Sequence, residues 1–270
     1  MIPVGFEYAR PGSVDEALAL LTEHGEDATV LAGGHSLLPV MKLRLATPEL
    51  VIDIGRLAEL SYITVDGDEV AIGAGTRHST VERSALLAAE CPLLPAVAAT
   101  VGDPQVRHRG TIGGSLAHAD PASDLPAAVL ALGGDVVLRS TRGERKVPIT
   151  SFYTGVFSTV KEPDELIVEV RVPRTGTAGW AYEKFNRRAN DWAIVGVAVV
   201  DGRVGLVNMG STPLRASTTE AALADGASIA DAAALADQRT DPPADLTATS
   251  DYRRHLARIL TKRALTTAAG

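Results

Sequence analysis

The chain has 270 residues, of which 46% are hydrophobic and 22% charged, and its formal net charge is −7. This composition predicts a globular protein with one large domain or two smaller ones, and the acidic balance gives a nucleic-acid partner no electrostatic support. No apolar run is long enough to predict a transmembrane helix. The N-terminus lacks the basic and apolar regions of a secretory signal, so we expect a cytoplasmic protein.

Cys91 is the only cysteine, which excludes an internal disulfide. An iron–sulfur cluster needs about four thiolates, and the six histidines show no zinc-ligand spacing. We therefore expect no metal site in this chain, and any redox chemistry must use an organic cofactor.

The first 56 residues predict a small lobe of helices and strands. Ser13 and Glu16 form a capping box before a helix with one apolar face. We expect strands at 28–31 and 50–54, with a short helix or extended turn at 37–45 between them.

The second segment begins with a hairpin, in which strands at 62–65 and 70–73 flank Asp66-Gly67. Residues 73–78 resemble a dinucleotide-binding glycine fingerprint, but His78 replaces the third glycine, so we discount this motif. Ser79 and Glu82 predict a capping box for a helix reaching Ala89.

Residues 102–126 form the longest stretch in which we predict no regular structure, and long loops inside compact domains are usually functional or disordered. Because helical patterns flank this stretch, we favour a functional loop. A helix at 125–132 and strands at 136–139, 145–148 and 166–172 follow it.

The last third predicts a separate unit after a linker at residues 173–179. Strands at 180–185, 193–200 and 203–209 predict a three-stranded antiparallel sheet. Ser217 and Glu220 predict another capping box, and an amphipathic final helix is expected to present Arg253, Arg254 and Arg258 outward.

Two short glycine turns are the most informative motifs, Ala32-Gly33-Gly34-His35-Ser36 and Thr111-Ile112-Gly113-Gly114-Ser115. Glycine permits a positive φ and a close approach of other groups, and successive free N–H groups form an anion-binding concavity. A lone Gly-Gly after a strand is more often a plain turn. Two such turns with adjacent hydroxyl groups favour a pair that binds a diphosphate.

Other candidates have competing interpretations. Asp120 and Asp124 could form a metal or acid–base pair, or Asp124 could cap the following helix. Lys184 is by default a surface lysine, although a cation there could stabilise a reduced flavin. Trp192 could pack in the core or against an aromatic ring. We expect His35 and His118 to form hydrogen bonds rather than catalyse.

The sequence resembles the FAD-binding medium subunit of the molybdenum hydroxylases, most closely those of aerobic carbon monoxide dehydrogenase and xanthine dehydrogenase. The two glycine turns with their continuations to Pro39 and Pro121 carry this resemblance. It extends over nearly the whole chain and includes Glu165-Leu166-Ile167, Lys184-Phe185 and Asp191-Trp192-Ala193.

The resemblance implies an α+β fold with a two-lobed FAD-binding domain of the PCMH type at residues 1–175, whose lobes span about 1–56 and 57–175. An α+β C-terminal domain with a three-stranded antiparallel sheet and helices would occupy residues 176–270. No residue is expected to be catalytic. The residues expected to bind FAD are Ala32, Gly33, Gly34, His35, Ser36, Leu37, Thr111, Ile112, Gly113, Gly114, Ser115, Asp124, Leu166, Lys184 and Trp192.

The resemblance also implies a relay of electrons within a larger oxidoreductase. A molybdopterin-binding large subunit would hydroxylate the substrate, and a small subunit with 2Fe–2S clusters would pass electrons to the FAD of this chain. The external acceptor would be quinone, NAD or dioxygen, and the complex a dimer of heterotrimers. Two alternatives stay open: a self-contained FAD-dependent oxidoreductase with its own substrate, and a non-catalytic nucleotide-binding or assembly protein.

Overall fold

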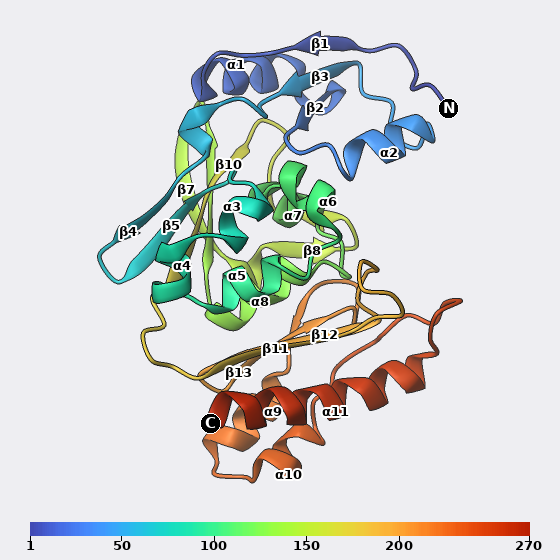
Figure 1. Ribbon diagram of the computed structural model, residues 1–270. Helices are drawn as coiled ribbons and strands as arrows, with labels where there is room; N and C mark the ends of the chain where they lie inside the picture. Colours follow the sequence, from blue (N-terminus) through green and yellow to red (C-terminus); the bar gives the residue numbers. More distant parts are fainter.

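The computed structural model describes residues 1–270 and shows three stacked parts, each with its own β-sheet (Figure 1). Three large clusters of buried apolar side chains correspond to these parts. The helices are α1 (Val14–His24), α2 (Leu37–Lys42), α3 (His78–Glu82), α4 (Ala85–Glu90), α5 (Leu93–Ala98), α6 (Pro104–Arg109), α7 (Ile112–His118), α8 (Asp124–Leu132), α9 (Ser217–Ala224), α10 (Ile229–Ala233) and α11 (Ser250–Ala269).

Three short 3-10 helices, η1 (Gly25–Asp27), η2 (Ala58–Leu60) and η3 (Ile149–Ser151), connect longer elements. The strands are β1 (Glu7–Ala9), β2 (Ala28–Leu31), β3 (Leu50–Asp53), β4 (Ile63–Asp66), β5 (Glu69–Gly73), β6 (Asp135–Ser140), β7 (Gly143–Pro148), β8 (Tyr153–Gly155), β9 (Ser158–Thr159), β10 (Leu166–Pro173), β11 (Trp180–Phe185), β12 (Val195–Val200), β13 (Arg203–Val207) and β14 (Leu214–Arg215).

The first lobe is a parallel sheet in the order β1-β3-β2, covered by α1. Ser13 caps α1 as predicted, accepting a hydrogen bond from the Glu16 backbone N–H. The short strand β1 was not predicted from the sequence, because three residues are too few to show an alternating pattern.

The second lobe is an antiparallel sheet in the order β4-β5-β10-β6-β7, and helices α5 and α8 lie between it and the C-terminal sheet (Figure 1). Its core joins apolar side chains of α5 and α8 to those of β5, β6 and β10. Helix α8 is buried along its whole length.

Two predictions for this lobe were wrong. Residues 102–126 are not an irregular loop, because they contain α6, α7 and the start of α8. Asp103 caps α6, which has Pro104 at its first turn, and Thr111 caps α7. Ser79 is not a helix cap: Arg77 precedes α3, and Ser84 caps the separate helix α4.

The C-terminal sheet has four antiparallel strands in the order β11-β12-β13-β14, so the three-stranded prediction was one strand short. Strand β14 has only two residues. Both faces of this sheet are covered, one by α8 and the other by α11. This arrangement explains why every residue of β12 is apolar or glycine and fully buried.

Two further C-terminal predictions were wrong. Arg253 does not point outward: it is fully buried and donates to the Ile194 carbonyl and, at 2.7 Å, to Asp245. Ser217 is not a cap, because Ala216 occupies the cap position of α9. The Glu220 carboxylate instead accepts from the Val204 backbone N–H and from Arg215.

Candidate functional site

A cavity of about 550 Å³ lies where the two N-terminal lobes and the C-terminal part meet. Such a volume is typical of small-molecule and cofactor sites. Every residue of the predicted FAD site lines this cavity except Ile112, whose side chain is fully buried in the core of the second lobe. Residues far apart in the sequence therefore converge on one concave surface.

The first glycine turn follows β2 and leads into α2. Gly34 has a φ of +82°, a conformation that favours glycine. The backbone N–H groups of Gly33, Gly34, His35 and Ser36 donate no hydrogen bond within the protein. None of these four residues is buried, so their N–H groups are free to donate to an anionic ligand in the cavity.

The second glycine motif differs from the first, since its backbone is already hydrogen-bonded. Ile112 N–H donates to the Thr76 carbonyl at 3.0 Å, and Gly113 N–H to the Ala74 carbonyl at 2.9 Å. Gly114 N–H donates to the Thr111 hydroxyl, and Ser115 N–H to the Thr111 carbonyl. This motif can therefore offer a ligand its side-chain hydroxyls rather than the N–H groups of residues 112–115.

Each motif has a glycine in close contact with another backbone segment. A Cβ on Gly33 would lie 2.5 Å from the Arg109 carbonyl oxygen, and a Cβ on Gly113 would lie 2.8 Å from the Ala74 carbonyl oxygen. Glycine at these positions is thus required by the approach of other backbone segments. The Arg77 guanidinium reinforces the junction by donating to the carbonyls of Gly55, at 2.9 Å, and of Arg109.

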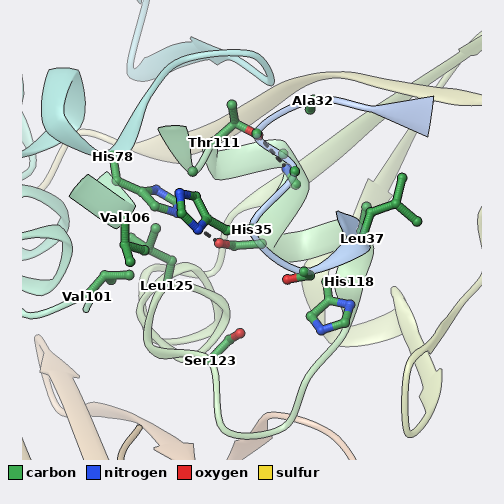
Figure 2. Close-up of a pocket in the computed structure, with 18 of the residues that line it drawn as sticks. Ala32, His35, Leu37, His78, Val101, Val106, Thr111, His118, Ser123 and Leu125 are labelled. Atoms are coloured by element: carbon green, nitrogen blue, oxygen red, sulfur yellow. Dashed lines mark hydrogen bonds between the residues drawn. The ribbon is translucent and has the colours of Figure 1, made fainter. Parts of the chain in front are cut away.

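His78 is a site residue that the sequence interpretation did not identify as one. The discounted run of residues 73–78 lies under the second glycine motif, and His78 N–H donates to the Gly110 carbonyl. The His78 Nε2 atom is 3.1 Å from the Ser115 Oγ, and Figure 2 shows the His78 and His35 side chains at the same end of the pocket. Burial lowers the pKa of His78 to about 4, so its ring is neutral at pH 7.

An ion pair between two parts of the chain lies at another wall of the cavity. Lys184, on β11, is 2.8 Å from the carboxylate of Asp124 on α8, and both side chains are less than 10% exposed. Lys184 also donates to the Thr100 carbonyl, and the Tyr182 hydroxyl donates to Asp124 at 2.5 Å. Burial raises the pKa of Asp124, which Lys184 and Tyr182 oppose. Lys184 is therefore not the surface lysine of the default interpretation.

The remaining candidates have distinct positions. Leu166 is buried at the start of β10, whereas Trp192 is 59% exposed and lies at the edge of the cavity. His118 also lines the cavity, with its ring 5.0 Å from that of Phe157. Asp120 does not line the cavity; its carboxylate accepts from the Ala122 backbone N–H. No group of three or more His, Cys, Asp or Glu side chains could hold a metal ion.

Several lining residues were not assigned to the site from the sequence, among them Val101, Val106, Gly110 and Lys161. Val101 and Val106 flank the capped start of α6, so recognising the Asp103-Pro104 cap was the signal that could have placed them near the motif. Lys161 carries no comparable sequence signal.

The fold and the cavity define this chain as a protein with a cofactor-sized cavity at the meeting point of its two N-terminal lobes and its C-terminal part, and with free N–H donors for an anionic ligand. A family model described as the FAD binding domain in molybdopterin dehydrogenase matches residues 4–175. A second model, the CO dehydrogenase flavoprotein C-terminal domain, matches residues 180–268. The chain belongs to the FAD-binding flavoprotein subunits of the molybdenum hydroxylase family.

Individual relatives match this chain over nearly its full length. The carbon monoxide dehydrogenase medium chain of Hydrogenophaga pseudoflava is 44% identical, with 99% of this chain and 98% of the relative covered. The caffeine dehydrogenase subunit beta of Pseudomonas sp. is 37% identical, with coverages of 100% and 96%. The structure of carbon monoxide dehydrogenase from Hydrogenophaga pseudoflava aligns with a TM-score of 0.96 and 45% identity, covering 100% of this chain and 99% of that chain.

The predicted family, fold class and cofactor are thereby confirmed: this chain is an FAD-binding subunit of an oxidoreductase. No helix of the structure combines the length and apolar character needed to cross a membrane.

Proposed function

We propose that this chain is the electron-transferring FAD subunit of a heteromeric enzyme that most resembles aerobic carbon monoxide dehydrogenase. It receives electrons from 2Fe–2S clusters of a small subunit, while a large subunit carries the molybdenum centre. The main support for this proposal is the cavity, which is lined by both the unpaired N–H groups of residues 33–36 and the Ser115 hydroxyl. Relatives named medium chain and subunit beta support a multi-subunit assembly.

The residues present fit FAD. The donors of residues 33–36 and Ser115 suit the diphosphate, and we assign Thr111, Gly113 and Gly114 to the same end of the site. Leu166, Lys184 and Trp192 suit the flavin ring, and Asp124 holds Lys184 in place. When bound, FAD supplies the redox chemistry. The protein binds it, orients it and places the Lys184 cation beside its reduced form.

We also propose the boundaries 1–175 and 176–270 for the two domains, with the first divided near residue 56. The limits of the two family matches support the boundary near 175. On the basis of the sequence resemblance we also propose a dimer of heterotrimers and an acceptor that is quinone, NAD or dioxygen. A cytoplasmic location is a separate proposal.

Affinity purification of the tagged chain from its native host tests the function. We expect a complex that contains FAD, molybdenum, iron and two further polypeptides, and whose flavin is reduced on addition of substrate. A yellow chain that purifies alone and turns over a substrate would favour the self-contained oxidoreductase instead. A chain that binds no FAD would contradict both flavoprotein hypotheses.

A further inference from the structure

His78 is the one histidine of the site whose side chain is almost fully buried, and its role is not explained by the assignments above. Its Nε2 atom lies 3.1 Å from the Ser115 Oγ, and this is the only hydrogen bond of the Ser115 hydroxyl. Its other ring nitrogen, Nδ1, is buried and has no hydrogen-bond partner. The two nitrogens therefore have very different surroundings.

The location of the proton on this neutral ring decides what Ser115 can do. A neutral imidazole carries one N–H donor and one acceptor nitrogen. A proton on Nδ1 would leave a buried N–H without an acceptor, which is costly and rare, whereas an unfilled acceptor is better tolerated. The unpartnered Nδ1 therefore favours the tautomer with its proton on Nε2.

This tautomer makes His78 the donor and Ser115 Oγ the acceptor in their hydrogen bond. The hydroxyl proton of Ser115 then has no partner inside the protein and is free to donate into the cavity that Ser115 lines. With the opposite tautomer, the hydroxyl would donate to His78 and present only lone pairs to the ligand, which repel an anion. The ring also fits closely beneath the motif, since a Cβ on Gly110 would meet His78 Cδ2 at 2.5 Å.

We propose that His78 is a positioning residue that holds Ser115 as a hydrogen-bond donor toward the phosphate oxygens of FAD. This inference rests on the proposed function, namely on Ser115 facing the diphosphate. The low pKa of His78 is consistent with it, because a ring that stays neutral keeps one fixed donor nitrogen near pH 7.

Two measurements on the full chain test the proposal. In the FAD-free chain, ¹⁵N NMR of labelled histidine, assigned by comparison with His78→Gln, is expected to show the His78 proton on Nε2. In FAD titrations, His78→Leu is expected to weaken binding about tenfold, as the loss of one hydrogen bond implies. His78→Gln is expected to stay within about threefold, because the Gln amide nitrogen can donate from nearly the same place.

A double-mutant cycle separates this role from a merely structural one. We expect Ser115→Ala to weaken FAD binding about tenfold, and His78→Leu to have no further effect in the Ser115→Ala background. Equal losses from His78→Leu in both backgrounds, or a proton found on Nδ1, would overturn the inference. If Ser115→Ala left FAD affinity unchanged, the proposed diphosphate site itself would fail, whatever the tautomer of His78.

Discussion

At the scale of single residues, Asp124 and Lys184 form a buried ion pair between the second lobe and the C-terminal part. Both charges are removed from water, and each side chain is satisfied by further hydrogen bonds, Asp124 by Tyr182 and Lys184 by the Thr100 carbonyl. Breaking a buried pair strands a charge in a medium of low polarity, which costs more than the pair itself contributes. The pair therefore stabilises the contact between the two domains, and it also fixes the position of the Lys184 charge at the proposed flavin site.

We predict that Lys184→Ala lowers the free energy of unfolding by about 3 kcal/mol, because the Asp124 carboxylate loses its partner. Urea denaturation of the FAD-free chain measures this loss. In the double variant Asp124→Asn with Lys184→Ala, much of it is expected to return. A double variant as unstable as the sum of the single variants would show that the two side chains do not act as a pair.

The same substitution has a second, separable outcome. We expect Lys184→Ala to retain FAD but with a lower reduction potential, because a cation near the flavin stabilises its reduced, anionic form. Equilibrium titration with a reference dye measures the potential in the purified variant. An unchanged potential would remove Lys184 from the neighbourhood of the flavin, while leaving the stability prediction intact.

At the scale of elements, each glycine turn is packed against a neighbouring segment by a contact that leaves no room for a Cβ. Gly33 abuts the end of α6, and Gly113 abuts Ala74 just after β5. The sequence alone suggests that larger residues here would block a ligand and leave the fold intact. The structure changes this expectation, because the atoms nearest these glycines belong to other segments of the protein itself.

We predict that Gly33→Ala and Gly113→Ala each weaken FAD binding at least tenfold and also destabilise the FAD-free chain by about 1–3 kcal/mol, because the added methyl forces backbone segments apart. Gly155→Ala is the matched control, since its Cβ would meet nothing closer than 3.9 Å. Fluorescence quenching of added FAD and thermal unfolding give the two quantities. Normal stability with lost FAD would instead indicate that the methyl blocks only the ligand.

How far the sequence predicts the elements depends on the range of the interactions that form them. Strands β2, β5, β10 and β11 were predicted nearly to their ends, because alternation and turn signals are local. The short helices α6 and α7 were missed, because their stability comes from caps and packing rather than from long periodic patterns.

The same distinction applies to the site. The glycine turns were recognisable because their residues are contiguous. His78 was not, since its only side-chain partner, Ser115, lies 37 residues away. The burial of Arg253 was also missed, because a helical arginine with polar neighbours is usually exposed, and its acceptor at Ile194 comes from a distant loop.

At the scale of the whole molecule, the cavity is lined by residues from all three parts of the structure. The first lobe supplies residues 32–37 and the second lobe supplies Thr111 and residues 113–115, whereas the C-terminal part supplies Lys184 and the loop that contains Asp191 and Trp192. A ligand long enough to contact all three parts is therefore expected to stabilise all three when it binds. A ligand that matches only the nucleotide end of FAD is expected to engage the glycine motifs alone.

Hydrogen exchange of the FAD-free chain tests this division of the cavity. We predict that saturating FAD slows amide exchange both at residues 33–36, whose N–H groups are unpaired in the protein, and in the loop at residues 186–193. ADP, which has the diphosphate but no flavin, is expected to protect residues 33–36 and leave the loop unchanged. Exchange followed by peptide mass spectrometry resolves both regions in one experiment. Equal protection of the loop by ADP and FAD would contradict the placement of the flavin beside Lys184 and Trp192, because only a ligand that contains the flavin should reach the C-terminal part.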